Sequence, residues 1–269
     1  PITEAVAYEF GRVYRRVRVN VGVSGTGGGF AKWARGEVTI IGASRPIEPA
    51  ERQQAAANGI EPIEFAIAYD GLSLVVNHEN DWADCLTVEQ LREIWSEHGR
   101  IQRWSQIDPA WPDRPISLYG PGTDSGTFDY FNEAVLESGG EGYSHTTRYT
   151  ASEDDNFLVQ GIAGDPYALG YFGFAYYREN RDQVRAVAVD GGSGCVEPSE
   201  ETIRNGSYVP LSRPLYIYVS SRAIARPEVQ AFVRFYLEHA AELVGRVGYI
   251  PLPAEMYEEG LTKLEQVTP

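Results

Sequence analysis

The chain has 269 residues, of which 43% are hydrophobic, and this predicts a folded protein large enough for two lobes rather than a disordered chain. Its formal net charge of -15 argues against nucleic-acid binding, which requires a basic surface, and implies that any bound anion is held by local donors. No apolar run approaches membrane-spanning length, so we expect a soluble body.

The first predicted elements are a helix, a strand and a glycine-rich turn. Residues 1–14 have the periodicity of an amphipathic helix. Its expected apolar face comprises Val6, Phe10 and Val13. Four valines alternate with other residues over 17–23, which predicts a half-buried strand. This strand leads into the turn SGTGGG at 24–29, and a helix is expected to follow the turn.

A second turn with the same organisation lies near the middle of the chain. A short apolar strand at 116–119 meets the turn GPGTDSGT at 120–127, and apolar residues then recur at helical spacing to Val135. Such a turn presents backbone N–H groups and hydroxyls at the positive end of a helix dipole, so it can bind an oxyanion without a lysine. The alternative is an ordinary capped turn with Asp124 or Ser125 as the N-cap. Two such turns in one chain favour anion binding.

Motifs for nucleotide binding and hydrolysis are incomplete in both turns. Gly28 stands where a Walker loop requires lysine, and Phe30 where the dinucleotide fingerprint requires its third glycine. Ser125 lies one place too late for a nucleophile elbow. The four histidines show no metal-ligand spacing. We therefore expect no catalytic residue, no metal and no cofactor.

Two charged residues occupy unusual positions beside apolar strands. Arg45 follows a short strand and a Gly-Ala-Ser turn, where its planar fork could face an anion, and we favour this over a solvated cation. Asp70 with Gly71 breaks the apolar stretch 60–77, which is long enough to cross from one lobe to another.

Further helices are expected at 87–95, where Thr87 to Gln90 has the form of a capping box, and at 152–162, with Phe157 on the buried face. A last helix is expected at 227–244, where Val229, Phe232, Val233, Tyr236, Leu237, Ala240 and Val244 form one apolar stripe that we interpret as core. Further strands are expected at 38–41, 169–177, 184–189 and 214–220.

Six stretches of the chain together match a known family. They are SGTGGGF, GASRP, AYDGLSLVVN, GPGTDSGTFDYF, SEDDN and ALGYFGFAYY, in this order. At these separations they resemble the phosphate-binding proteins of bacterial phosphate ABC transporters, the PstS family, over nearly the whole chain. The resemblance implies a two-lobed periplasmic-binding-protein fold of type II, in which each α/β lobe is a sheet flanked by helices and phosphate binds in the cleft between the lobes. Lobe one would comprise residues 1–70 and 215–269, and lobe two residues 71–214.

The resemblance also implies a function. The protein would be a non-enzymatic, high-affinity receptor that delivers inorganic phosphate to the membrane permease of an ABC transporter. It would act as a monomer in the periplasm or outside the cell, either free or lipid-anchored, with the family's N-terminal phosphate loop preceding Pro1. The alternatives are a receptor for another tetrahedral oxyanion, such as sulfate or arsenate, and a phosphoester hydrolase on the same scaffold. Hydrolysis would require a metal cluster or an activated nucleophile, and the sequence contains neither signal.

Family positions carried over one by one predict the residues that bind phosphate. They are Ser24, Gly25 and Thr26 in the first turn, and Ser125, Gly126 and Thr127 in the second. Arg45 stands where many members have Asp, and Pro121 where those members have Arg. We interpret this as an exchange in which Arg45 supplies the cation from lobe one, and we predict that it makes a bidentate contact with the bound anion.

The exchange leaves open which carboxylate accepts the proton of phosphate. Such an acceptor would reject sulfate, which carries no proton near neutral pH. We rank Asp70 first, because local structure explains its charge least, and Asp124 second, with Asp155 as a further candidate.

Cys85 and Cys195 are the only cysteines, and from spacing alone they fit either one disulfide or two buried thiols. The exported setting and their common lobe predict the disulfide.

Overall fold

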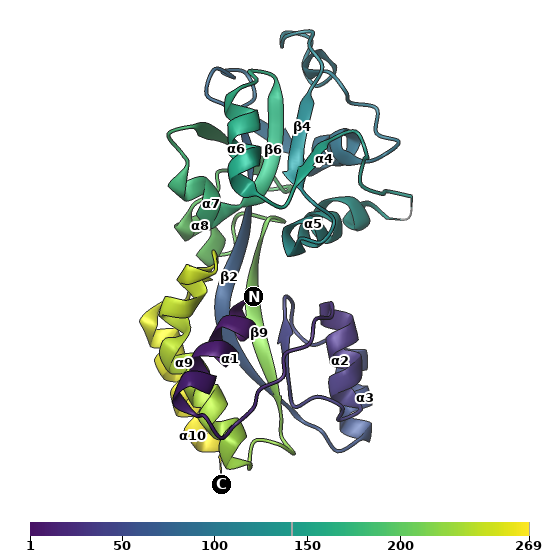
Figure 1. Ribbon diagram of the computed structural model, residues 1–269. Helices are drawn as coiled ribbons and strands as arrows, with labels where there is room; N and C mark the ends of the chain where they lie inside the picture. Colours follow the sequence, from purple (N-terminus) through teal and green to yellow (C-terminus); the bar gives the residue numbers. More distant parts are fainter. Residues whose placement is uncertain (141, 269) are drawn as a thin grey trace. The chain divides into compact units, whose positions relative to one another are not determined.

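The computed structural model describes residues 1–140 and 142–268, and the chain forms two compact units (Figure 1). Unit 1 contains Pro1–Asp70 and the chain from Arg213 onward, and unit 2 contains Gly71–Ser212. The chain passes between the units within two strands, β2 (Pro62–Asn77) and β9 (Ser212–Ser220). β2 continues through the Asp70-Gly71 pair, where the sequence predicted a break.

Unit 1 is a small sheet with helices on both faces. β1 (Ile40–Ala43) pairs antiparallel with β9, β9 is the neighbour of β2, and β10 (Ile250–Pro251) pairs antiparallel with the first half of β2. One face is covered by α1 (Ile2–Val13), α9 (Pro227–Arg246) and α10 (Ala254–Val267), and the other by α2 (Thr26–Ala34) and α3 (Pro49–Ala57) (Figure 1).

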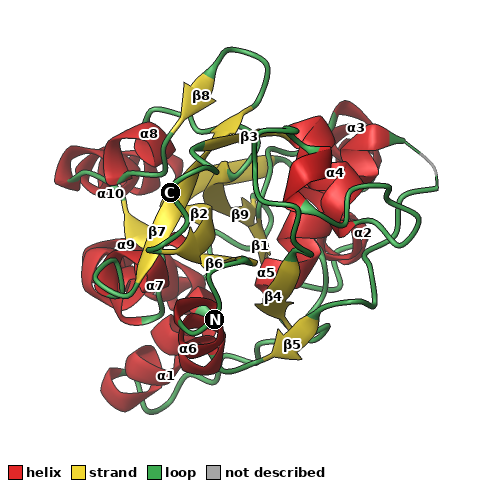
Figure 2. Cartoon of the chain, turned by 90° about the horizontal axis from the view of Figure 1, so that it is seen from above, coloured by secondary structure: helices red, strands yellow, loops and turns green. Residues whose placement is uncertain are grey.

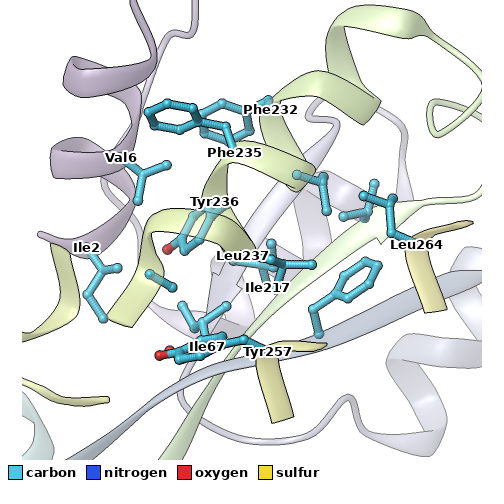
Figure 3. Packing of buried hydrophobic residues seen from close by; sticks show 14 of the residues in the cluster. Ile2, Val6, Ile67, Ile217, Phe232, Phe235, Tyr236, Leu237, Tyr257 and Leu264 are labelled. Carbon is cyan, nitrogen blue, oxygen red and sulfur yellow. The ribbon is translucent and has the colours of Figure 1, made fainter. Parts of the chain in front are cut away.

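Alternation along β9 divides the core of unit 1 into two parts. Ile217 and Val219 pack with α1, α9 and α10, whereas Tyr218, between them, packs with α2 and α3. Figure 3 shows the first cluster, in which Phe232 and Tyr236 of α9 lie beside residues of α1, β2 and α10. Every apolar position predicted for the last helix is buried, which confirms that stripe as core.

The N-terminal region differs from the prediction in two respects. Val13 is 65% exposed, because α1 turns Phe10 and the residues one and two turns before it toward the core. Residues 17–23 pair with no strand in the described chain. Val17 packs against the core, but Val23 is 90% exposed. Alternating valines favour an extended backbone, but a strand also requires a neighbour to share its hydrogen bonds.

Unit 2 is built around a sheet of parallel and antiparallel strands. β6 (Ala168–Gly173) pairs antiparallel with β2 and parallel with β4 (Ser117–Pro121), and β4 pairs parallel with β5 (Thr150–Ser152) beside it (Figure 2). β7 (Val184–Asp190) pairs with β2, with the parallel strand β3 (Cys85–Thr87) and with the antiparallel strand β8 (Cys195–Val196). Its α-helices are α4 (Val88–Trp95), α5 (Gly126–Phe131), α6 (Asp155–Ala163), α7 (Phe174–Glu179) and α8 (Glu200–Arg204). It also contains the short 3-10 helices η1 (Trp104–Gln106) and η3 (Glu137–Gly139) and the π-helix η2 (Asn132–Leu136).

The predictions for unit 2 were right in most elements and wrong in two details. The expected capping box starts α4, with Thr87 Oγ1 accepting from Gln90 N (3.1 Å) and the Gln90 side chain accepting from Thr87 N (2.9 Å). The run predicted as strand over 169–177 ends at Gly173 and continues as α7, because a helix also buries Phe174 and partly buries Tyr176 and Tyr177. Phe157, expected inward on α6, is 50% exposed.

Cys85 and Cys195 are joined in a disulfide with a Cα–Cα distance of 6.0 Å, which is the pairing that the sequence predicts. The bond links β3 to β8 and encloses a sequence separation of 110 residues within unit 2. In the described part of the chain, none of the helices is both long and apolar enough to cross a membrane.

Candidate functional site

The first predicted turn opens α2 in unit 1. Gly25 is the N-cap, with extended backbone (φ -63°, ψ 163°), and no described side chain caps the helix. The first intrahelical bond runs from Gly29 N to Gly25 O (2.9 Å). The earlier N–H groups of the first turn must therefore find partners outside the helix, at the positive end of its dipole. This is the arrangement that binds anions at helix starts.

Hydroxyl groups surround the same helix start. Ser24 lies beside the first turn, since a Cβ placed on Gly29 would be 3.6 Å from Ser24 Oγ. Thr26 Oγ1 lies 3.0 Å from Ser44 Oγ and accepts a hydrogen bond from Ser44 N (3.2 Å). These bonds tie the residue after β1 to the start of α2. They bring Thr26 next to the turn that carries Arg45.

The Arg45 guanidinium lies beside the first turn of α2, but it already forms a bidentate ion pair with a carboxylate. A Cβ on Gly27 would lie 3.8 Å from Arg45 Nη2. Arg45 Nη1 and Nη2 donate to the two oxygens of Glu51 at 2.9 and 2.8 Å. The bidentate contact that we predicted for the anion is made here to Glu51, so the role of Arg45 toward phosphate stays a prediction.

The second predicted turn opens α5 in unit 2. Ser125 is its N-cap, and Ser125 Oγ accepts from Thr127 N (3.1 Å). Ser125 N also donates to Gly122 O (3.1 Å), which closes the turn. Asp124 is exposed and is not the cap. The capped turn thus uses the hydroxyl oxygen of Ser125 and two N–H groups, those of Ser125 and Thr127.

Three acidic residues, 153–155, follow β5 at the same edge of the sheet at which the second turn follows β4. β4 and β5 are parallel with Pro121 opposite Ser152, and Gly122 N donates to Ser152 O (3.2 Å). The carboxylate of Glu153 lies against Gly122, where a side chain on residue 122 would overlap it. Because parallel strands end at one edge, residues 153–155 and the second turn lie close together.

Asp155 is a half-buried carboxyl for which the described chain provides no hydrogen bond or ion pair. Its neighbour Asp154 caps α6, with Oδ1 accepting from Asn156 N (2.9 Å). Burial, together with the charges of Asp154 and Glu153, raises the pKa of Asp155 from 3.8 to about 6. Asp155 therefore gains or loses a proton just below neutral pH.

Aromatic side chains support the end of β4. Tyr149 OH donates to Pro121 O (3.0 Å). His145 Nδ1 donates to Thr146 O (2.9 Å), which leaves Nε2 to accept from Tyr171 OH (3.1 Å). Burial lowers the pKa of His145 and keeps its ring neutral. These hydrogen bonds fix the aromatic side chains beside the second turn.

Asp70 has a partner within unit 1 that the sequence did not indicate. Arg213 Nε lies 3.3 Å from Asp70 Oδ2, and the two side chains are 19% and 15% exposed. Burial, and next the charge of Asp70, raise the pKa of the neighbouring Tyr249 to about 12. The pair gives the Asp70 charge a structural reason, and its role as proton acceptor stays a prediction.

Comparison with known proteins identifies the family. Residues 1–239 match the model of the PBP superfamily domain. The chain is 46% identical to Protein SphX of Synechocystis sp. over 97% of this chain and 77% of that protein, and 37% identical to the phosphate-binding protein PstS of Staphylococcus saprophyticus over 99% and 82%. The chain belongs to the PBP superfamily, and within it to the PstS family. Among solved structures, it is similar to a possible phosphate-binding protein from Planctomyces limnophilus, with 43% identity, a TM-score of 0.94, and coverage of 100% of this chain and 95% of that one.

Membership of the PstS family agrees with the mixed α/β periplasmic-binding-protein fold. Sequence reasoning missed two charged residues next to the candidate positions of this PstS-family chain, Glu51 and Arg213. Glu51 had a local signal, because Pro49 at N1 and Glu51 at N3 mark the start of α3, where a capping box forms with Glu48. Arg213 had none, since its partner lies more than a hundred residues away in the sequence.

Proposed function

We propose that this chain is a receptor that binds inorganic phosphate and delivers it to the permease of an ABC transporter. The observation that carries the proposal is the start of α2, where Ser24, Thr26 and Arg45 lie around helix N–H groups that no described side chain caps, in a chain 37% identical to a PstS protein. This arrangement supports anion binding in a protein whose net charge of -15 would otherwise repel an anion.

The proposed ligand residues are those of the two turns. Ser24, Gly25 and Thr26 would donate from unit 1, with Arg45 as the cation. Ser125, Gly126 and Thr127 would donate from unit 2. The cap from Ser125 to Thr127 N leaves the hydroxyl hydrogens of Ser125 and Thr127 and the Gly126 N–H as the donors that this turn offers an anion.

Titration calorimetry with inorganic phosphate tests the proposal. The parent protein should bind one phosphate per chain with a saturable heat. Thr26→Val keeps the shape of the side chain but removes the hydroxyl, and it should weaken binding by about 1 kcal/mol or more. The matched control Thr268→Val changes a threonine in the last residues of unit 1, and it should bind as the parent does. A parent without phosphate binding, or with turnover of a chromogenic phosphoester, would refute the proposal.

We also propose that Asp155, rather than Asp70 or Asp124, accepts the proton of phosphate. Asp155 is supported by its place beside the second turn and by its lack of a donor in the described chain. Asp70 already has Arg213, and Asp124 is exposed. A carboxylate that takes the phosphate proton would meet sulfate with no hydrogen to share, so it would exclude sulfate.

Competition between phosphate and sulfate decides among these carboxylates. Asp155→Asn supplies an amide donor at the same position, so this variant should bind sulfate and should bind phosphate less tightly. Asp70→Asn and Asp124→Asn should reject sulfate as the parent does. If Asp155→Asn still rejects sulfate while one of the other variants accepts it, the acceptor is that other residue.

The proposed setting is outside the cytoplasmic membrane. A disulfide fits an oxidising compartment, which supports this setting. We propose that the receptor acts as a monomer, either free or lipid-anchored. Sedimentation of the purified protein tests the first statement, and fractionation of cells into membrane and soluble material tests the second.

A further inference from the structure

The guanidinium of Arg45 is held in place from several sides within unit 1. Its Nη1 and Nη2 contact the two carboxylate oxygens of Glu51 at 2.9 and 2.8 Å, and Nη1 also donates to Pro46 O (3.1 Å). Its Cζ lies 5.5 Å from the centre of the Phe30 ring, which is fully buried in α2. A planar cation held at one edge and on one face has little rotational freedom left.

Glu51 is itself fixed by the backbone of α3. It is the N3 residue of a capping box, in which its side chain accepts from Glu48 N (2.9 Å) and the Glu48 side chain accepts from Glu51 N. The Glu51 side chain is 17% exposed, and its hydrogen bond with Arg45 lowers the pKa of its carboxyl. The start of α3 therefore determines where Arg45 lies, and Arg45 Nη2 comes to lie beside Gly27 in the first turn of α2.

The net charge around Arg45 is negative, whereas Coulomb attraction of an anion would require a positive one. Glu48 also lies close to Arg45, with 3.4 Å between Oε1 and Nε. One cation and two carboxylates give this group a net charge of -1. The two glutamates therefore oppose an approaching anion electrostatically, and an advantage of Glu51 must come from geometry.

We propose that Glu51 is a positioning residue of the phosphate site. Glu51 holds Arg45 so that Nη2 faces an anion at the start of α2. This inference rests on the proposed function. In this arrangement Nη1 and Nη2 keep their hydrogen bonds to Glu51, and the anion contacts the second N–H of Nη2 instead of forming the predicted bidentate contact. The inference predicts the sign of the effect: removing the negative charge of Glu51 weakens phosphate binding, whereas Coulomb repulsion alone would predict tighter binding.

The test measures phosphate affinity by calorimetry in Glu51→Gln and Glu51→Ala. Glu51→Gln keeps the capping box, because its amide oxygen still accepts from Glu48 N, but it loses one acceptor for Arg45. We expect Glu51→Ala to weaken phosphate binding about tenfold, the lower end of what supporting partners of a binding side chain contribute, and Glu51→Gln to weaken it less. Glu48→Gln is the matched charge control. It removes the same charge and keeps an acceptor for the cap, so it should bind at least as tightly as the parent.

A double-variant comparison separates positioning from general damage to the fold. In an Arg45→Ala background, a further Glu51→Ala change should no longer weaken phosphate binding, because its positioning role is already lost and only the removal of a repelling charge remains. Equal or tighter binding by Glu51→Ala in the parent background would overturn the inference, as would an equal loss in both backgrounds. A parent that does not bind phosphate would refute the proposed function itself, together with the inference that rests on it.

Discussion

Replacing Asp155 by Asn should stabilise the folded protein near neutral pH. Asp155 is half-buried, and the described chain gives it no hydrogen bond or ion pair. Burial and the neighbouring acids raise its pKa from 3.8 to about 6. The folded state therefore binds the Asp155 proton more tightly than the unfolded state does. Between these two pKa values the folded protein carries more protons, so stability falls as the pH rises through this window.

The size of the effect follows from the two pKa values. A rise from 3.8 to about 6 corresponds to about 3 kcal/mol of lost stability above pH 6, at about 1.4 kcal/mol for each pH unit between them. Water reaches part of the side chain and screens its charge, so we expect about half of this, about 1–2 kcal/mol. Asn removes the charge and keeps the shape, so Asp155→Asn should recover that amount at pH 8 and much less at pH 4.

Urea unfolding followed by tryptophan fluorescence measures this difference in phosphate-free buffer. The quantity to compare is the free energy of unfolding of Asp155→Asn minus that of the parent, at pH 4 and pH 8. Asp124→Asn is the control, since it removes an exposed acid from the neighbouring turn and should stay within about 0.5 kcal/mol of the parent at both pH values. A destabilised Asp155→Asn at pH 8, or a gain that is equal at both pH values, would refute the assignment of a raised pKa.

Three further changes test the stability of the folded chain within each unit. Replacing Cys85 and Cys195 by Ser should lower the free energy of unfolding by about 2–4 kcal/mol in urea, because the bond closes a 110-residue separation; an unchanged urea midpoint would contradict this. Gly161→Ala should lower the melting temperature, because the new methyl group meets the Tyr119 ring at a cost of about 1–3 kcal/mol, which outweighs a gain of about 1 kcal/mol in helix propensity. Phe10→Ala should cost about 3–5 kcal/mol in chemical unfolding, because this ring is fully buried against α9, and a loss below 1 kcal/mol would show that α1 adds little to the core.

The sequence by itself determined the elements whose signals are local. The Thr87–Gln90 capping box and the apolar stripe of α9 depend on spacings of a few residues, so periodicity and end signals were enough to predict them. The two turns before α2 and α5 were predicted for the same reason, since Gly, Ser and Thr at a helix start have few other uses.

The tertiary structure alone decided the surroundings of the charged residues. Sequence inspection assigned Arg45 to an anion and ranked Asp70 first as proton acceptor, whereas the folded chain gives them Glu51 and Arg213 as partners. Asp155 looked like an ordinary acid in the first turn of a helix, and its raised pKa depends on burial that only the packing of α6 creates. Hydrogen bonds within a helix end join near neighbours, but the energy of a charge depends on every group and on the water around it. Those surroundings come from segments distant in the sequence, so no local pattern records them.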